Sequence, residues 1–194
     1  MKKIVIASLI LSTIVMTGCE DLPGVLTVTK AFNAVVKRKT KTIDVGQYKT
    51  SLDFKRNKVV AIIDTGSEKM KIELAVPDNA QIPSNGNFEL SAAQTGQPFD
   101  VLGSVQTQVN ESEMRSEYES CTYQTYDTIC TPSGCHSVPV NRYGNRFIDY
   151  YVRDTNQKMD FDMTTSGDAR SKLSHFAGAA RYSEKIVTRE SSCF

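Results

Sequence analysis

Apolar and polar residues alternate in short runs along much of this chain. In segments such as 69–74 and 158–163 every second residue is apolar, and turn-favouring residues separate one run from the next. A period of two residues is typical of strands that bury one face. The pattern predicts an all-β fold, an antiparallel β-sandwich or barrel of about ten or eleven short strands.

One segment departs from this pattern. Within residues 168–181, Leu173, Phe176, Ala177 and Ala180 fall on one helical face behind a Ser-Gly-Asp start. This spacing predicts one short helix. Gly178 interrupts it, so a loop followed by a longer final strand is the alternative.

The amino terminus carries two lysines and then an apolar run from Ile4 to Met16. The run is shorter than the roughly 20 residues that a membrane-spanning helix needs, so it predicts a secretory signal peptide. Met16-Thr17-Gly18-Cys19 resembles the lipobox of bacterial lipoproteins. The resemblance implies cleavage before Cys19 and its modification by fatty acyl chains such as palmitate; the alternative is ordinary secretion with Cys19 as a free or disulfide-bonded thiol.

These boundaries divide the chain into a signal peptide (1–18), a lipidated linker (19–24) and one β-rich envelope domain (25–194). In lipoproteins of enterobacteria an Asp after the cysteine usually retains the protein in the inner membrane, and this chain has Glu20 there. We therefore expect a lipid anchor in the outer membrane of a Gram-negative bacterium, facing the periplasm.

Charge gives little indication of a partner. Without residues 1–18 the chain has 21 basic and 22 acidic residues, because Lys2 and Lys3 leave with the signal. This balance gives no reason to expect nucleic acid. The basic run Lys37–Lys41 is interpreted as a solvated edge strand, with a patch for lipid headgroups as the alternative.

Four cysteines remain for disulfides, namely Cys121, Cys130, Cys135 and Cys193. If 121–130 is one strand, its ends lie about 30 Å apart, too far for a disulfide. Cys130 and Cys135 enclose Thr-Pro-Ser-Gly and can face each other across a hairpin. The predicted pairs are therefore Cys130–Cys135 and Cys121–Cys193. Zinc bound by Cys130, Cys135 and His136 is disfavoured, because exported cysteines usually oxidise, and we expect neither metal nor cofactor.

The run Ala-Ile-Ile-Asp-Thr-Gly-Ser at 61–67 resembles the catalytic loop of aspartic peptidases. The resemblance implies that Asp64 is one of two catalytic carboxylates. A similar segment begins at Asp154, but Asn156 stands where that family has glycine. We interpret both segments as hairpin turns in which Asp accepts hydrogen bonds from backbone N–H groups. An enzyme of the aspartic-peptidase type using Asp64 is kept as a remote alternative.

Six tyrosines cluster in the second half: Tyr118, Tyr123, Tyr126, Tyr143, Tyr150 and Tyr151. We expect cross-strand aromatic pairs, with a stacking surface for sugars or a protein as the alternative. Together these features predict a lipid-anchored envelope protein with a binding or structural role and no catalytic residues. A β-barrel or sandwich that binds a small ligand is the second interpretation, and neither names a protein or ligand partner.

Overall fold

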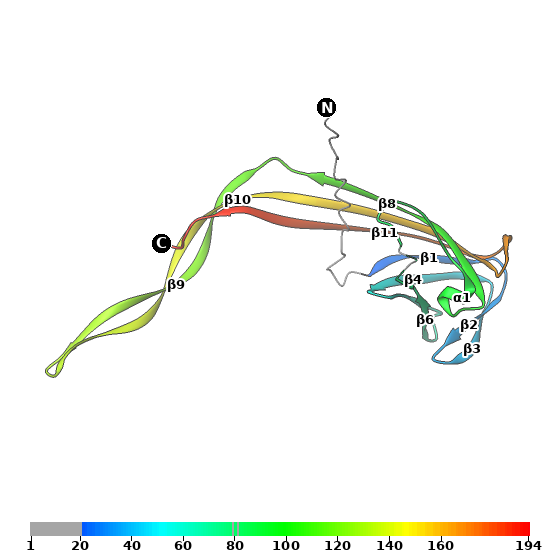
Figure 1. Ribbon diagram of the computed structural model, residues 1–194, viewed down its shortest axis with the longest axis horizontal. Helices are drawn as coiled ribbons and strands as arrows, with labels where there is room; N and C mark the ends of the chain where they lie inside the picture. Colours follow the sequence, from blue (N-terminus) through cyan, green and yellow to red (C-terminus); the bar gives the residue numbers. More distant parts are fainter. Residues whose placement is uncertain (1–20, 79, 81) are drawn as a thin grey trace, which may run out of the picture. The chain divides into compact units, whose positions relative to one another are not determined.

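The computed structural model describes residues 21–78, 80 and 82–194. It confirms the all-β fold, with eleven strands and one short helix (Figure 1). The elements are β1 (Leu22–Val28), β2 (Phe32–Val36), β3 (Lys39–Ile43), β4 (Gly46–Lys55), β5 (Lys58–Asp64), β6 (Lys69–Ala75), β7 (Gly86–Leu90), α1 (Ala92–Thr95), β8 (Phe99–Glu111), β9 (Arg115–Thr131), β10 (Gly134–Thr165) and β11 (Asp168–Glu190). No helix in the described part of the chain is long and apolar enough to cross a membrane.

Nine strands form one sheet in the order β6-β5-β4-β1-β11-β10-β8-β7, with β9 beside β10, and β2 and β3 form a separate hairpin. The described residues divide into two compact units. Unit 1 comprises the residues up to Thr107 and Gln157–Ala180; unit 2 comprises Gln108–Asn156 and Arg181–Phe194. The single domain predicted for 25–194 stays a prediction, because β8, β10 and β11 contribute residues to both units.

In unit 1 the β2–β3 hairpin packs against strands of the large sheet. Phe32 of β2 packs edge-on against Phe99 of β8, with ring centroids 5.4 Å apart. The buried side chain of Gln97 accepts a hydrogen bond from the Val35 N–H at 2.8 Å and donates to the carbonyls of Val35 and Glu73 at 3.2 and 2.9 Å. One side-chain amide thus joins β2 to β6, the strand at one end of the sheet order.

The core of unit 1 consists of the inward residues of alternating strands. The largest fully buried side chains there include Leu26, Leu52, Ile63, Ile72, Phe99, Met159 and Phe176. Phe161 and Phe176 stack with their ring centroids 4.9 Å apart. Gly24 and Gly178 face each other across β1 and β11, and a β-carbon on either would come within 2.6 Å of the Phe176 ring. These two glycines make room for the aromatic core.

Residues 168–181 lie in β11, so the predicted short helix is wrong; the alternative is right in its final strand, but the strand already begins at Asp168 and no loop precedes it within these residues. Residues 174–178 pair with β1, and β11 also neighbours β10. Pairing on both sides satisfies the backbone of this segment, so the strand prevails over the local helical spacing of its apolar residues. Strands β9, β10 and β11 are 17, 32 and 23 residues long, much longer than the predicted short strands.

Candidate binding surface

Strands β9 and β10 form a long hairpin in unit 2. Their pairing runs from Arg115 opposite Tyr150 to Thr131 opposite Gly134. Cys130 lies opposite Cys135 near the end of the hairpin, and the two are joined by a disulfide with Cα atoms 3.9 Å apart. The pairing predicted from their spacing is therefore present.

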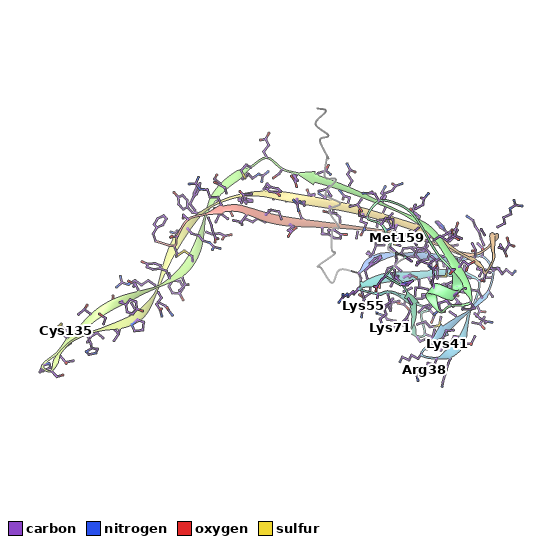
Figure 2. The ribbon with its side chains drawn as sticks, viewed as in Figure 1. Arg38, Lys41, Lys55, Lys71, Cys135 and Met159 are labelled. Carbon is purple, nitrogen blue, oxygen red and sulfur yellow. A yellow bond between two sulfur atoms is a disulfide. The ribbon has the colours of Figure 1, made fainter. Side chains whose placement is uncertain are left out.

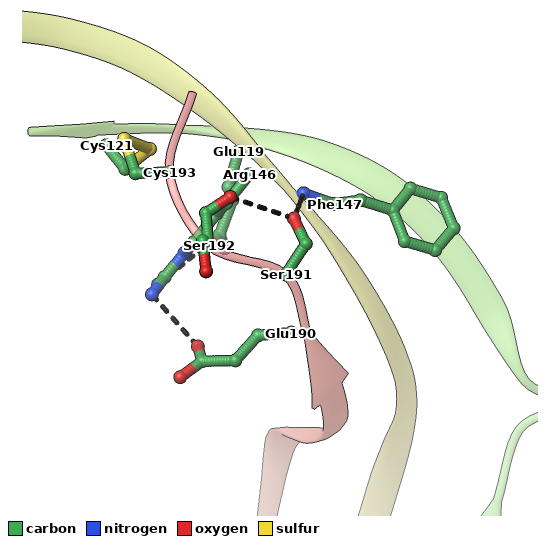
Figure 3. Close-up of a disulfide and its surroundings, with 8 residues drawn as sticks. All are labelled: Glu119, Cys121, Arg146, Phe147, Glu190, Ser191, Ser192 and Cys193. Carbon is green, nitrogen blue, oxygen red and sulfur yellow. Dashed lines mark hydrogen bonds and ion pairs between the residues drawn. A yellow bond between two sulfur atoms is a disulfide. The ribbon is translucent and has the colours of Figure 1, made fainter. Parts of the chain in front are cut away.

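The second predicted disulfide is present as well and ties the carboxyl-terminal tail to the hairpin (Figure 3). Cys121 and Cys193 have Cα atoms 6.0 Å apart. The tail also pairs with β10: the N–H of Ser191 donates to the Phe147 carbonyl at 2.8 Å, and Asn145 and Phe194 exchange two backbone hydrogen bonds. Beyond this contact the hairpin continues as two strands, between residues 122 and 143.

One face of the hairpin is charged. Lys185 of β11 lies 2.5 Å from Glu117 and 2.9 Å from Glu119, and its ammonium group lies 4.4 Å from the centre of the Tyr150 ring. Arg146 bridges Glu119 at 3.0 Å and Glu190 at 2.9 Å (Figure 3). These contacts hold together the part of unit 2 in which β11 and the tail accompany the hairpin.

The same contacts shift the acid–base properties of the cluster. Hydrogen bonds from Lys185 and Tyr150 lower the pKa of Glu117, and hydrogen bonds from Lys185 and Arg146 lower the pKa of Glu119. Hydrogen bonds to Glu117 and Glu119 raise the pKa of Lys185. Each group is therefore stabilised in its charged form at neutral pH.

The opposite face of the hairpin is uncharged over residues 118–128 of β9 and 137–147 of β10, and Asp149, which lies opposite Ser116, is outside this stretch. Alternation and register place on it the even-numbered residues of β9 and the odd-numbered residues of β10. In this stretch the residues of this face are Tyr118, Ser120, Thr122, Gln124, Tyr126 and Thr128 on β9, and Ser137, Pro139, Asn141, Tyr143, Asn145 and Phe147 on β10. Only aromatic, amide, hydroxyl and proline side chains contribute to this surface, which we call the uncharged face.

Three tyrosines dominate the uncharged face. Tyr118, Tyr126 and Tyr143 are 68%, 66% and 90% exposed. Tyr118 forms the expected kind of cross-strand aromatic pair with Phe147, with ring centroids 5.5 Å apart. Tyr126 and Tyr143 instead lie opposite Pro139 and Thr122. Rings exposed to this degree present area that a partner can cover.

Unit 1 has an open surface groove of about 530 Å³ over β7, β8, β10 and β11, lined by both polar and apolar residues. Asp162 and His175 both line it, with the Asp162 carboxylate 2.9 Å from His175 Nδ1, and the same carboxylate lies 2.5 Å from Lys172 Nζ. Burial raises the pKa of Asp162, but the hydrogen bonds with Lys172 and His175 outweigh burial and lower it overall. Glu89 and Asp160 also line the groove, so three carboxylates lie along it.

Asp64 is the last residue of β5 and lies at a hairpin turn. Its carboxylate accepts a hydrogen bond from the Gly66 N–H at 2.9 Å, and Gly66 has a φ of 83°. The Thr65 hydroxyl donates to the Glu68 carbonyl at 2.9 Å. The geometry is that of a turn closed by Asp and Thr side chains, as the sequence predicted.

Asp154 has a different setting, and the prediction of a second hairpin turn is wrong. Residues 154–156 lie inside the continuous strand β10. The Asp154 carboxylate lies 2.5 Å from the Ser183 hydroxyl and 3.5 Å from Arg181. This segment has no glycine that would favour a turn, and β10 lies beside β11 in the sheet. It therefore continues as a strand.

The remaining predicted residues are placed as follows. Cys19 lies outside the described residues, so its lipidation stays a prediction. Cys130 and Cys135 are oxidised and cannot act as thiolate ligands beside His136. In the part of the chain that the structure describes, no three His, Cys, Asp or Glu side chains are grouped to hold a metal ion.

Two features of this surface were missed at the sequence level. The first is Gly144, where a side chain would collide with the tail. The second is the uncharged face, although its signal was in the sequence: between 117 and 128, the charged residues Glu117, Glu119 and Asp127 all have odd numbers. Separating the residues of the strand by parity would have revealed it.

Fold and surface together define an antiparallel β-protein with a disulfide-closed hairpin. No protein family, curated protein or solved structure matches this chain.

Proposed function

We propose that this chain is a lipid-anchored cell-envelope protein that acts by binding, and that the uncharged face of the β9–β10 hairpin is its binding surface. The lipobox-like sequence at 16–19 supports the anchor. The single observation that carries the binding role is the exposure of Tyr118, Tyr126 and Tyr143 on a face without charge.

The chemistry of this face indicates the class of partner. Tyrosine offers large contact area at low entropic cost, and Ser, Thr, Asn and Gln offer adaptable hydrogen bonds. A charged partner would lose hydration there without meeting an opposite charge. We therefore propose a macromolecular partner with an uncharged polar surface. The two disulfides keep the hairpin ordered before the partner arrives, which lowers the entropic cost of binding.

The binding proposal is tested with a photo-crosslinking amino acid introduced at single positions in the producing bacterium. Positions 126 and 143 report on the uncharged face, and positions 136 and 142 on the opposite face serve as matched controls. We expect one discrete crosslinked species from 126 and 143 and none from the controls. Crosslinks of equal yield from both faces, or none from either, contradict this assignment.

The anchor is tested separately by labelling with a radioactive fatty acid. The wild type is expected to incorporate label, and Cys19→Ala is expected to lose it together with signal cleavage. A Cys19→Ala variant that still carries fatty acid contradicts the anchor without bearing on the hairpin.

The groove of unit 1 supports a second candidate, a lipoprotein that binds a small polar ligand. The carboxylates of Glu89, Asp160 and Asp162 line a groove of about 530 Å³, beside His175. A screen of small polar cations by thermal shift tests this candidate, with Asp162→Asn as the control variant. A ligand that raises the melting temperature of Asp162→Asn as much as that of the wild type binds outside the groove.

A further inference from the structure

The β2–β3 hairpin of unit 1 is the most basic segment in the described part of the chain. Residues 30–43 contain five basic side chains and no acidic one: Lys30, Lys37, Arg38, Lys39 and Lys41. Lys37, Arg38 and Lys39 lie at or beside the turn that joins β2 to β3, and Lys41 follows on β3. The hairpin therefore presents a concentrated positive charge in a chain whose total charge is nearly balanced.

This charge is carried by a well-anchored element. Phe32, Ala34, Val36 and Ile43 are all at least 93% buried. The backbone of Val35 is also fixed by the side chain of Gln97. The tip of the hairpin thus has a defined position in unit 1.

The two central residues of the turn are unusual for its backbone conformation. Val36 pairs with Lys39, so Lys37 and Arg38 are the two central residues, and their φ angles are 49° and 65°. Positive φ at both positions is the type I′ turn, for which Asn-Gly is strongly favoured. Long side chains in this conformation cost backbone energy. Lys37 and Arg38 thus depart from the residue preference of this turn type. Such a departure indicates that their side chains serve a purpose other than folding.

The charges at the tip are also unpaired. Lys41 forms an ion pair with Glu68, whereas Lys37, Arg38 and Lys39 have no ion-pair partner among the described residues. In the view of Figure 2, Arg38 and Lys41 lie on the same side of unit 1 as Lys55 and Lys71. An anion that approaches the tip of the hairpin meets Lys37, Arg38 and Lys39, whose charges no described carboxylate neutralises.

The chain between the expected anchor and unit 1 is short, which favours lipid headgroups as the anion that the hairpin meets. Leu22 begins β1 three residues after Cys19, and three extended residues span at most about 11 Å. Leu22 pairs with Leu52, which places the following Lys55 and Arg56 at the same end of the sheet. A protein acylated at Cys19 would therefore hold unit 1 within a short distance of the lipid surface.

We propose that the β2–β3 hairpin is a docking site for the phosphate groups of anionic phospholipids, with Lys37 and Arg38 as its central contacts. The choice of a membrane rests on the proposed lipid anchor. Basic residues beside a lipid anchor supply a second attachment and fix which part of the protein faces the bilayer. The hairpin then orients unit 1 on the membrane that holds the anchor.

The test measures vesicle binding without the anchor, so it is independent of acylation. The mature chain with Cys19→Ser is exported through an ordinary secretory signal so that both disulfides form. It is mixed with phosphatidylcholine vesicles, with or without about one third phosphatidylglycerol, and bound protein is measured by cosedimentation. We expect binding only to the anionic vesicles, and we expect it to weaken as salt rises.

Two variants separate charge from turn geometry. Replacing Lys37 and Arg38 by Asn and Gly should lower the partition coefficient roughly 30-fold, from about fivefold for each cation removed, and should raise the melting temperature. Replacing both by Gln should weaken binding equally without that gain in stability. The control Lys158→Asn/Arg170→Asn removes two exposed cations of β10 and β11 and should bind like the parent.

Several outcomes overturn the proposal. These are binding that does not depend on anionic lipid, a Lys37→Asn/Arg38→Gly variant that binds as the parent does, and an equal loss in the control. A protein that does not bind vesicles but is retained by duplex DNA would have a nucleic-acid site instead of a lipid site, which also overturns the proposal. A fall in melting temperature on introducing Asn-Gly removes the argument from the turn. If the wild type incorporates no fatty acid, or Cys19→Ala still carries it, while vesicle binding holds, the anchor is wrong and the hairpin assignment stands.

Discussion

Gly144 and Phe194 lie in direct contact, although 50 residues separate them in the sequence. A β-carbon on Gly144 would stand 2.3 Å from the Phe194 carbonyl oxygen. Gly144 is also the cross-strand partner of Cys121, whose disulfide holds Cys193. The missing side chain at 144 therefore provides the space in which the tail reaches its disulfide partner.

Gly144→Ala should consequently displace the tail. We expect a destabilisation of about 1–3 kcal/mol, as for other substitutions that force extra atoms into a packed contact. The fraction of protein with the Cys121–Cys193 bond, measured by mass mapping under non-reducing conditions, should fall. Thr122→Ala, on the uncharged face beside this site, serves as the control and should leave both values unchanged.

The two disulfides should differ in their effect on stability. They close loops with sequence separations of 72 and 5 residues. Chain entropy predicts losses of about 4 kcal/mol for Cys121→Ser/Cys193→Ser and about 2 kcal/mol for Cys130→Ser/Cys135→Ser. Urea unfolding followed through tyrosine fluorescence measures the difference. A larger loss on removal of the tip disulfide would show that loop length does not determine its contribution.

Lys185, Glu117 and Glu119 should stabilise the fold only between an acidic and an alkaline pH limit. The pKa values of Glu117 and Glu119 are lowered on folding, so their contribution is present above the ordinary value of 4.5 and is lost as pH falls through the folded values. The pKa of Lys185 is raised, so its contribution is present below 10.5 and is lost as pH rises through the folded value.

Lys185→Met tests this dependence. Its melting temperature should lie below that of the wild type at neutral pH, and the gap should narrow at both acidic and alkaline extremes. The cluster is exposed, so the gap should be small and should shrink in high salt. A gap that stays constant from acid to alkali would assign the effect to lost packing on the Tyr150 ring instead of charge.

Asp64→Asn tests the turn against the remote peptidase alternative. The amide oxygen of Asn can still accept from the Gly66 N–H, so we expect a change of less than about 1 kcal/mol in the free energy of unfolding. Asp154→Asn is a useful comparison, because its carboxylate contacts Ser183 and Arg181 instead of a turn backbone. Proteolysis by the wild type at acid pH, blocked by a pepsin-type inhibitor and absent in Asp64→Asn, would contradict the turn interpretation.

Several properties of this protein followed from the sequence because they depend on neighbouring residues. Alternating polarity predicted the all-β fold, since side chains of a strand point to opposite faces in turn. The spacing of Cys130 and Cys135 across four turn residues predicted their disulfide, and the length of the strand from Cys121 predicted the other. The Asp64 turn also depends only on residues within a few positions of it.

Tertiary structure decided what depends on distant partners. Residues 168–181 have a helical spacing of apolar side chains, but pairing with β1 made them a strand. Residues 154–156 look like a turn when read alone, yet they continue β10 beside β11. Gly144 matters only because the tail lies against it, and Gln97 only because β2 and β6 approach it. Hydrogen bonds and close contacts between residues far apart in the chain leave no local pattern, so only the folded structure could determine them.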